Sequence, residues 1–321
     1  MPSVATPQKS TEPTPEMIFN SQMKPPAADP QAAEPKPEVI FEAAEVPLPL
    51  PQTKRVSLAR RAGRLLVDAV NFAATYVMIN VTSAVALILF RVLNRTKIYG
   101  RWNIGVSKNT LLCSNHRTMI DSYLVGHLST WPFGWILPRV LLYHPAAKEN
   151  FFRNRIIGWF SWRWRCIPVR RGVKDFDALR VMTETLPKGQ MCIFPEGTRS
   201  RTGELKEGRP GTGKLIHDTR CKVVPIYHSG MENLLPVGTV WPRIFRRLEV
   251  NIGKPIDMSD LNARPSSKET SVIVIERVMK AIAELKAESE ARAAARVPWY
   301  VAVKRGFLRL AGLPSSLVRR F

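Results

Sequence analysis

A run of 22 consecutive residues without a charged side chain, residues 69–90, constrains this chain more than any other feature. Basic residues flank the run: Arg60, Arg61, Arg64, Arg91, Arg95 and Lys97. A helix of this length crosses a hydrocarbon core of about 30 Å. The run also holds the polar residues Asn71, Thr75, Asn80, Thr82 and Ser83, which weaken the case for a spanning helix. Three arrangements stay open: a transmembrane helix, a helix or helical pair in one leaflet, which we favour, and a buried core helix.

The distribution of charge along the 321 residues indicates an anionic partner. Residues 1–51 contain 12 of the 26 prolines and carry a net charge of −4, against +22 for the whole chain, so the rest carries +26. A segment of that composition cannot bury enough apolar surface to fold, and we predict that residues 1–54 are a disordered acidic, proline-rich tail. The basic remainder is typical of a protein that binds nucleic acid, an anionic membrane or a phosphorylated substrate.

The apolar run favours a membrane among these partners. We expect residues 55–95 to form a membrane-associated helical segment. Residues 298–321 repeat the signal, since they combine five basic residues with aromatic side chains and contain no acid, although a helix packed on the body is the alternative. The four cysteines form no paired motif, which is typical of free thiols in a reducing compartment. The expected location is the cytoplasmic face of a membrane, monotopic or single-span.

Short apolar runs alternate with helical periodicity through the middle of the chain. Strands are expected at 110–113, 166–169, 191–194, 223–227 and 248–252, and helices at 175–186 and 213–218. This alternation predicts an α/β fold with a mostly parallel sheet flanked by helices, which we assign to residues 96–260. Residues 261–321 are expected to form a C-terminal amphipathic helix and a basic membrane-surface tail. A capping box at Ser266 and Glu269 would start that helix, which would run to about Arg296.

The loop after the strand at 110–113 contains a histidine five residues before an aspartate, His116 and Asp121. A neutral imidazole can take a proton near neutral pH, and a carboxylate on its other nitrogen fixes the tautomer. The two side chains meet only if His116 lies in the loop and Asp121 in the first turns that follow. A capping or core histidine is the alternative.

Two further loops follow predicted strands and carry groups suited to phosphate. In residues 194–200, Gly197 lets the backbone approach a ligand, while Thr198 and Arg199 offer hydrogen-bond donors. In residues 166–172, Arg171 ends a stretch rich in arginine and tryptophan, which fits a headgroup interface better than stacked bases. An ordinary turn with a salt bridge is the alternative for the first loop.

These loops together resemble the glycerophospholipid acyltransferase family, whose best-known members acylate lysophosphatidate. The resemblance covers residues 96–260 and rests on four motifs in order: Asn115-His116 with Asp121, Ile167 to Gly172, Phe194 to Ser200, and Val223 to Ile226. Residues 211–216 and 225–231 resemble the tafazzin branch more closely. The chain departs from that branch at residues 196–199, where it keeps the arginine of the general family motif.

The resemblance implies an acyltransferase that uses a His-Asp general base and no acyl-enzyme. His116 would take the proton of a glycerol hydroxyl and Asp121 would hold it. The substrate would be bound by Arg171, Glu196, Gly197, Thr198 and Arg199, with the arginines on its phosphate and Glu196 orienting Arg199 or a substrate hydroxyl. No metal and no bound cofactor are expected. Acyl-coenzyme A or acyl carrier protein would be the co-substrate.

Two other functions stay open. A tafazzin-like transacylase would move acyl groups between phospholipids without a thioester. A basic nucleic-acid-binding protein is permitted by charge alone, but the sequence has no helix-turn-helix, zinc-finger or RNP pattern, and the apolar run has no place in one. We therefore expect the partners to be an anionic membrane surface, a lysophospholipid and an acyl thioester, without nucleic acid. The sequence gives no oligomeric state.

Overall fold

The computed structural model describes residues 58–295, with side chains from residue 63 onward. The predicted tail at 1–54 and the basic stretch at 298–321 lie outside the described residues. The predicted division into domains stays a prediction.

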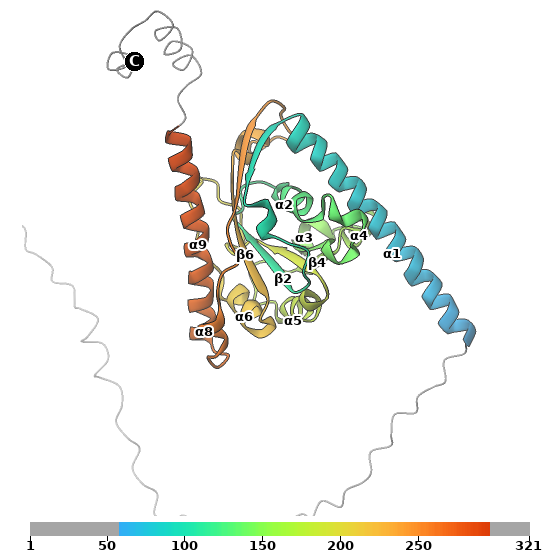
Figure 1. The fold of residues 1–321 in the computed structure, drawn as a ribbon. Helices are drawn as coiled ribbons and strands as arrows, with labels where there is room; N and C mark the ends of the chain where they lie inside the picture. Colours follow the sequence, from blue (N-terminus) through green and yellow to red (C-terminus); the bar gives the residue numbers. More distant parts are fainter. Residues whose placement is uncertain (1–57, 296–321) are drawn as a thin grey trace, which may run out of the picture. The chain divides into compact units, whose positions relative to one another are not determined.

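A mixed sheet of seven strands organises the described part of the chain (Figure 1). The strands are β1 (Arg95–Tyr99), β2 (Thr110–Ser114), β3 (Leu142–Ala147), β4 (Cys166–Val169), β5 (Gln190–Ile193), β6 (Lys222–Ser229) and β7 (Arg247–Ile252), in the order β1-β7-β6-β2-β5-β3-β4. Five neighbouring strands, β6 to β4, are parallel, whereas β7 is antiparallel to β6 and β1 is parallel to β7. The mostly parallel α/β fold is confirmed.

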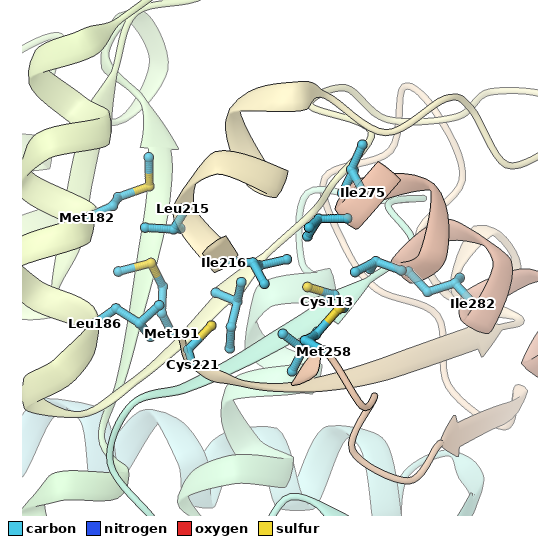
Figure 2. Packing of buried hydrophobic residues seen from close by; sticks show 14 of the residues in the cluster. Cys113, Met182, Leu186, Met191, Leu215, Ile216, Cys221, Met258, Ile275 and Ile282 are labelled. Carbon is cyan, nitrogen blue, oxygen red and sulfur yellow. The ribbon is translucent and has the colours of Figure 1, made fainter. Parts of the chain in front are cut away.

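Helices cover both faces of the sheet, as parallel strands require. On one face, α5 (Phe176–Thr185), α6 (Pro210–Thr219) and α9 (Lys268–Ala294) pack on Leu111 and Cys113 of β2. Figure 2 shows part of this core. On the other face, α2 (Asp121–Thr130) and the end of α1 (Leu58–Leu87) pack on Leu112. The shorter helices are α3 (Lys148–Phe151), α4 (Arg155–Arg163), α7 (Met231–Leu234) and α8 (Ser259–Asn262), with 3₁₀ turns at Arg101–Asn103, Phe133–Trp135, Pro138–Val140 and Leu186–Lys188.

The apolar run of the sequence lies in one continuous helix, so a helical pair was the wrong alternative. α1 continues as a π-helix through Ile88–Val92, and Gly63–Val92 is long and apolar enough to cross a membrane by length and composition. Its polar side chains contact the body: Arg163 donates to Asn71 at 2.7 Å, and the Trp164 indole donates to Thr82 at 3.1 Å. Exposed apolar side chains occur along the rest of the helix: Leu65, Leu66, Val67, Val70, Phe72, Val77, Val81, Val85 and Ile88.

The C-terminal helix α9 starts one residue later than the sequence predicts. Ser267, rather than Ser266, is the N-cap, because its hydroxyl accepts the Thr270 N–H at 3.0 Å. The helix ends at Ala294 instead of near Arg296. Ile275, Val278 and Ile282 of the predicted amphipathic helix are buried in the core that α9 shares with α6 and β6.

Candidate active site

His116 and Asp121 meet at the end of β2, in the geometry that the sequence required. His116 lies in the loop between β2 and α2, and Asp121 is the first residue of α2. The His116 Nδ1 atom lies 2.9 Å from Asp121 Oδ2. Asp121 is completely buried, whereas 19% of the His116 side chain is exposed. With Nδ1 held by the carboxylate, Nε2 is the nitrogen free to accept a proton.

Asp121 is held as a carboxylate by its neighbours. Burial alone raises its pKa, but the nearby His228, the hydrogen bond with His116 and the Thr118 hydroxyl together lower the pKa below its ordinary value. The backbone N–H groups of Arg117 and Thr118 also donate to Asp121 Oδ2, at 2.5 and 2.8 Å. The aspartate therefore fixes both the imidazole and the first turn of α2.

The loop of residues 194–200 holds the backbone of His116 in place. The His116 N–H donates to Glu196 Oε1 at 3.1 Å, and its carbonyl accepts the Ser200 N–H at 2.8 Å. The Phe194 ring stacks on the imidazole with centroids 4.0 Å apart. Glu196 is buried, which raises its pKa, and its other oxygen accepts the Lys206 N–H at 3.1 Å. Glu196 thus accepts hydrogen bonds from two backbone amides. Of the two roles that the resemblance implied, orienting Arg199 or a substrate hydroxyl, the first is supported by no hydrogen bond or ion pair among the described residues.

A cavity of about 600 Å³ opens beside His116. Its walls come from α1, α2, β3, β4 and β5, and most of its lining side chains are apolar. Three arginines line it as well: the predicted Arg171 and Arg199, and Arg209. No Asp or Glu side chain of the described residues lines this cavity. The cavity therefore combines an apolar interior, a histidine and three arginines, and no described carboxylate lines it.

Arg209 is a lining residue that sequence reasoning missed. Its backbone N–H donates to Pro195 O at 2.8 Å, which attaches it to the loop of residues 194–200. Gly197 has a left-handed φ of +69°, and a Cβ there would lie 3.2 Å from the Arg209 Cγ atom. The glycine thus leaves room for the arginine side chain. No spacing in the sequence could have assigned Arg209 to the site.

Thr198 and Arg171 are both exposed, and only Arg171 lines the cavity. The Thr198 hydroxyl is exposed and accepts from Lys206 Nζ at 3.1 Å, and Thr198 is not among the cavity-lining residues. Arg171 is exposed, and its backbone N–H donates to Glu149 at 3.3 Å. Among the described residues, no group of three His, Cys, Asp or Glu side chains could hold a metal ion.

A fully buried histidine, also missed, lies beside Asp121. His228 Nε2 is 3.8 Å from Asp121 Oδ2 and 3.0 Å from the Asn115 carbonyl. Asn115 in turn pairs its side-chain amide with the His228 backbone at 2.9 and 3.0 Å. These contacts fix the loop of His116 to β6. Their signal was the histidine in the 225–231 motif.

Residues 95–229 match the family model described as Acyltransferase. This segment belongs to the glycerophospholipid acyltransferase family. Within this acyltransferase segment lie His116, Asp121 and all three cavity arginines, whereas β7 and α9 follow it.

Similar proteins carry two kinds of name. Tafazzin of Drosophila melanogaster is 27% identical over 65% of this chain and 61% of its own length. A chloroplastic 1-acyl-sn-glycerol-3-phosphate acyltransferase of Arabidopsis thaliana is 31% identical over 44% of this chain and 38% of its own length. The chain therefore spans less than two thirds of these relatives. The crystal structure of a 1-acyl-sn-glycerophosphate acyltransferase from Thermotoga maritima has the same fold, with a TM-score of 0.50, 23% identity, and coverage of 68% of this chain and 81% of that one.

Proposed function

We propose that this protein transfers a fatty acyl group from an acyl thioester to the free hydroxyl of 1-acylglycerol-3-phosphate, giving phosphatidate. The observation that carries the proposal is the His116–Asp121 pair at a cavity that also holds three arginines and an apolar interior. Acyl-coenzyme A or acyl carrier protein would be the donor.

In this mechanism His116 Nε2 takes the proton of the acceptor hydroxyl as the oxygen attacks the thioester carbonyl carbon. The Asp121 carboxylate stabilises the imidazolium through Nδ1–H. The tetrahedral intermediate then breaks the carbon–sulfur bond, and the leaving thiolate takes the proton back from His116. The hydroxyl attacks directly, so no acyl-enzyme forms.

The arginines favour a phosphomonoester as the acceptor headgroup. Arg171, Arg199 and Arg209 line the cavity, and none of them has an ion-pair partner among the described residues. A guanidinium fork binds phosphate in bidentate fashion, and several forks match a dianion better than a singly charged phosphodiester. This supports lysophosphatidate over lysophospholipids with larger headgroups.

We further propose that the protein is monotopic, with α1 embedded in one leaflet of the cytoplasmic face. The helix contacts α4 and α2 from Asn71 to Ser83, a stretch of about three and a half turns. If α1 spanned the bilayer, those contacts would place Arg163 and His127 of the body in the hydrocarbon core, which is costly. An embedded apolar face with polar side chains toward the body avoids that cost.

The second candidate is a thioester-independent transacylase. The relative named tafazzin supports it, since that match extends over a larger share of this chain than the Arabidopsis acyltransferase match does. Both reactions would use the same base and differ in the acyl donor.

The deciding experiment uses the purified chain, anionic vesicles and labelled lysophosphatidate, with and without acyl-coenzyme A. Labelled phosphatidate that forms only with the thioester, together with an equal amount of free thiol, supports the proposed reaction. Product that forms equally without it identifies vesicle phospholipid as donor and supports the transacylase. If neither condition gives product while His116 and the fold are intact, the proposed function is wrong.

A further inference from the structure

A second cavity, separate from the His116 cavity, lies at strands β1 and β7. It has a volume of about 250 Å³ and is lined by Arg95, Lys97, Arg247 and Leu248. The three basic residues are exposed on their strands. No ion pair among the described residues involves any of them. The pocket therefore concentrates three basic side chains that form no ion pair within the described part of the chain.

An exposed apolar loop leads directly into this basic pocket. Between α7 and β7, Val237, Val240, Trp241 and Phe245 are 85%, 83%, 84% and 75% exposed. We call residues 237–245 the apolar loop. Such a cluster is unusual on a soluble surface and marks a contact with lipid or protein.

Backbone hydrogen bonds hold the apolar loop in place. The Arg243 N–H donates to Leu234 O and the Phe245 N–H donates to Leu93 O, both at 2.8 Å. Phe245 has a φ of +60°, a conformation that bulky residues rarely adopt. The next residue, Arg246, donates its N–H to the Asn94 side chain at 2.7 Å. These hydrogen bonds fix the backbone of the apolar loop from which Trp241 and Phe245 project.

The basic pocket and the apolar loop lie at the same edge of the sheet as the active site. β7 runs antiparallel to β6, so the start of β7 lies beside the end of β6, and β1 follows β7. In register, Lys97 pairs with Glu249, which pairs with Ser229. Three strand spacings, about 14 Å, separate β1 from β2, the strand that leads to His116. The basic pocket and the active site therefore lie toward the same ends of neighbouring strands.

We propose that this edge docks on an anionic bilayer. The basic pocket holds the phosphate of an anionic phospholipid, while Trp241 and Phe245 insert among the acyl chains of the same leaflet. Charge complementarity selects lipid over a protein partner, because cations flanking exposed aromatics match the headgroup region and the acyl region in turn. This contact is separate from α1 and would turn the mouth of the His116 cavity toward its lipid substrates.

The insertion is tested with an environment-sensitive dye on Trp241→Cys in the full chain. The four native cysteines are buried, so the introduced thiol reacts selectively. We expect the emission to shift to shorter wavelength when vesicles of equal parts phosphatidylcholine and phosphatidylglycerol are added. The same dye on Lys188→Cys, at the opposite edge of the sheet, should not respond. If the protein binds the vesicles, as judged by flotation, and the emission of the dye at position 241 does not shift, the proposed insertion of this loop is wrong.

Headgroup binding is tested with Arg95→Gln/Arg247→Gln. This variant should bind the mixed vesicles about 30-fold more weakly and pure phosphatidylcholine vesicles as before. The matched variant Lys108→Gln/Lys188→Gln removes two exposed cations at the opposite edge, more than a Debye length away, and should bind both like the wild type. Equal losses in the two variants would contradict the pocket. Neither readout requires turnover, so a failure here is separate from a failure of the proposed reaction.

Discussion

A substitution at His116 is expected to affect activity without affecting folding stability. Its side chain is partly exposed and makes one hydrogen bond, to Asp121. We predict that His116→Ala lowers turnover of lysophosphatidate by about 10²- to 10⁴-fold, the contribution of a general base, and keeps the melting temperature within a few degrees. Both quantities are measured on the same preparation. Wild-type-like turnover in this variant would refute the mechanism.

Asp121→Asn is the informative companion to that substitution. Because Asp121 also accepts two backbone N–H groups, the variant should lose activity and stability together. A drop in stability for Asp121→Asn but not for His116→Ala would distinguish the structural from the chemical contribution of the pair.

The cavity arginines should affect substrate binding more than turnover. We predict that Arg171→Ala and Arg209→Ala each raise the KM for lysophosphatidate by about 10- to 100-fold, the value of a hydrogen bond to a charged group. Arg170→Ala is the matched control, because Arg170 pairs with Asp175 at 3.0 Å and does not line the cavity. A loss confined to kcat, or an equal effect of Arg170→Ala, would show that Arg171 and Arg209 do not bind the substrate phosphate.

The site could be predicted from the sequence only where its residues are neighbours along the chain. His116 and Asp121 are five positions apart and one loop brings them together. Glu196 was found through its motif, but its contacts with the His116 and Lys206 amides depend on how two loops pack. Arg209 enters the cavity because Gly197 lacks a side chain, which no local pattern indicates.

At the scale of elements, the crossing of α6 and α9 depends on a single glycine. A Cβ at Gly213 would lie 1.9 Å from the Ser271 carbonyl oxygen of α9, so the helices would have to separate. We predict that Gly213→Ala lowers the free energy of unfolding by about 1–3 kcal/mol, measured by urea denaturation.

Gly211 provides the matched control in the same helix. A Cβ there meets nothing within 4 Å, so Gly211→Ala should leave stability unchanged or raise it by up to about 1 kcal/mol. Similar losses in both variants would contradict the crossing with α9 as the cause, because Gly→Ala by itself favours the helix.

The sequence predicted five of the seven strands because each is an apolar run that ends in turn residues. β1 was missed because it alternates exposed and partly buried side chains and carries Arg95 and Lys97. β3 was missed because it contains His144 and Pro145 and borders the cavity. The reversal of β7 follows from its connection to β6, which has no long crossover helix and was not visible in any single segment.

At the scale of the whole molecule, a buried histidine of α2 contacts α1 and helps to hold it against the body. His127 of α2 is 3% exposed, and its Nδ1 lies 3.1 Å from the Ser83 carbonyl of α1. Burial lowers its pKa to about 4, against the opposing effect of that hydrogen bond. His144 lines the cavity beside His116, as His127 does, and burial lowers its pKa to about 4 as well. The folded chain therefore keeps both imidazoles neutral under conditions in which an unfolded chain would protonate them.

This difference predicts acid sensitivity with a defined direction. Between the ordinary histidine pKa of 6.5 and about pH 4, the unfolded chain binds protons on these histidines and the folded chain does not. Their contribution to folding stability is therefore fully present above pH 6.5 and is lost as the pH falls from there to about 4. Each histidine should cost roughly 2 kcal/mol of unfolding free energy at about pH 5. The measurement compares urea denaturation near pH 7.5 and pH 5 for the wild type and for His127→Gln. The variant should lose less stability between the two pH values, whatever its stability at pH 7.5, because glutamine does not titrate. If the two proteins lose the same amount, His127 is not a source of the acid sensitivity.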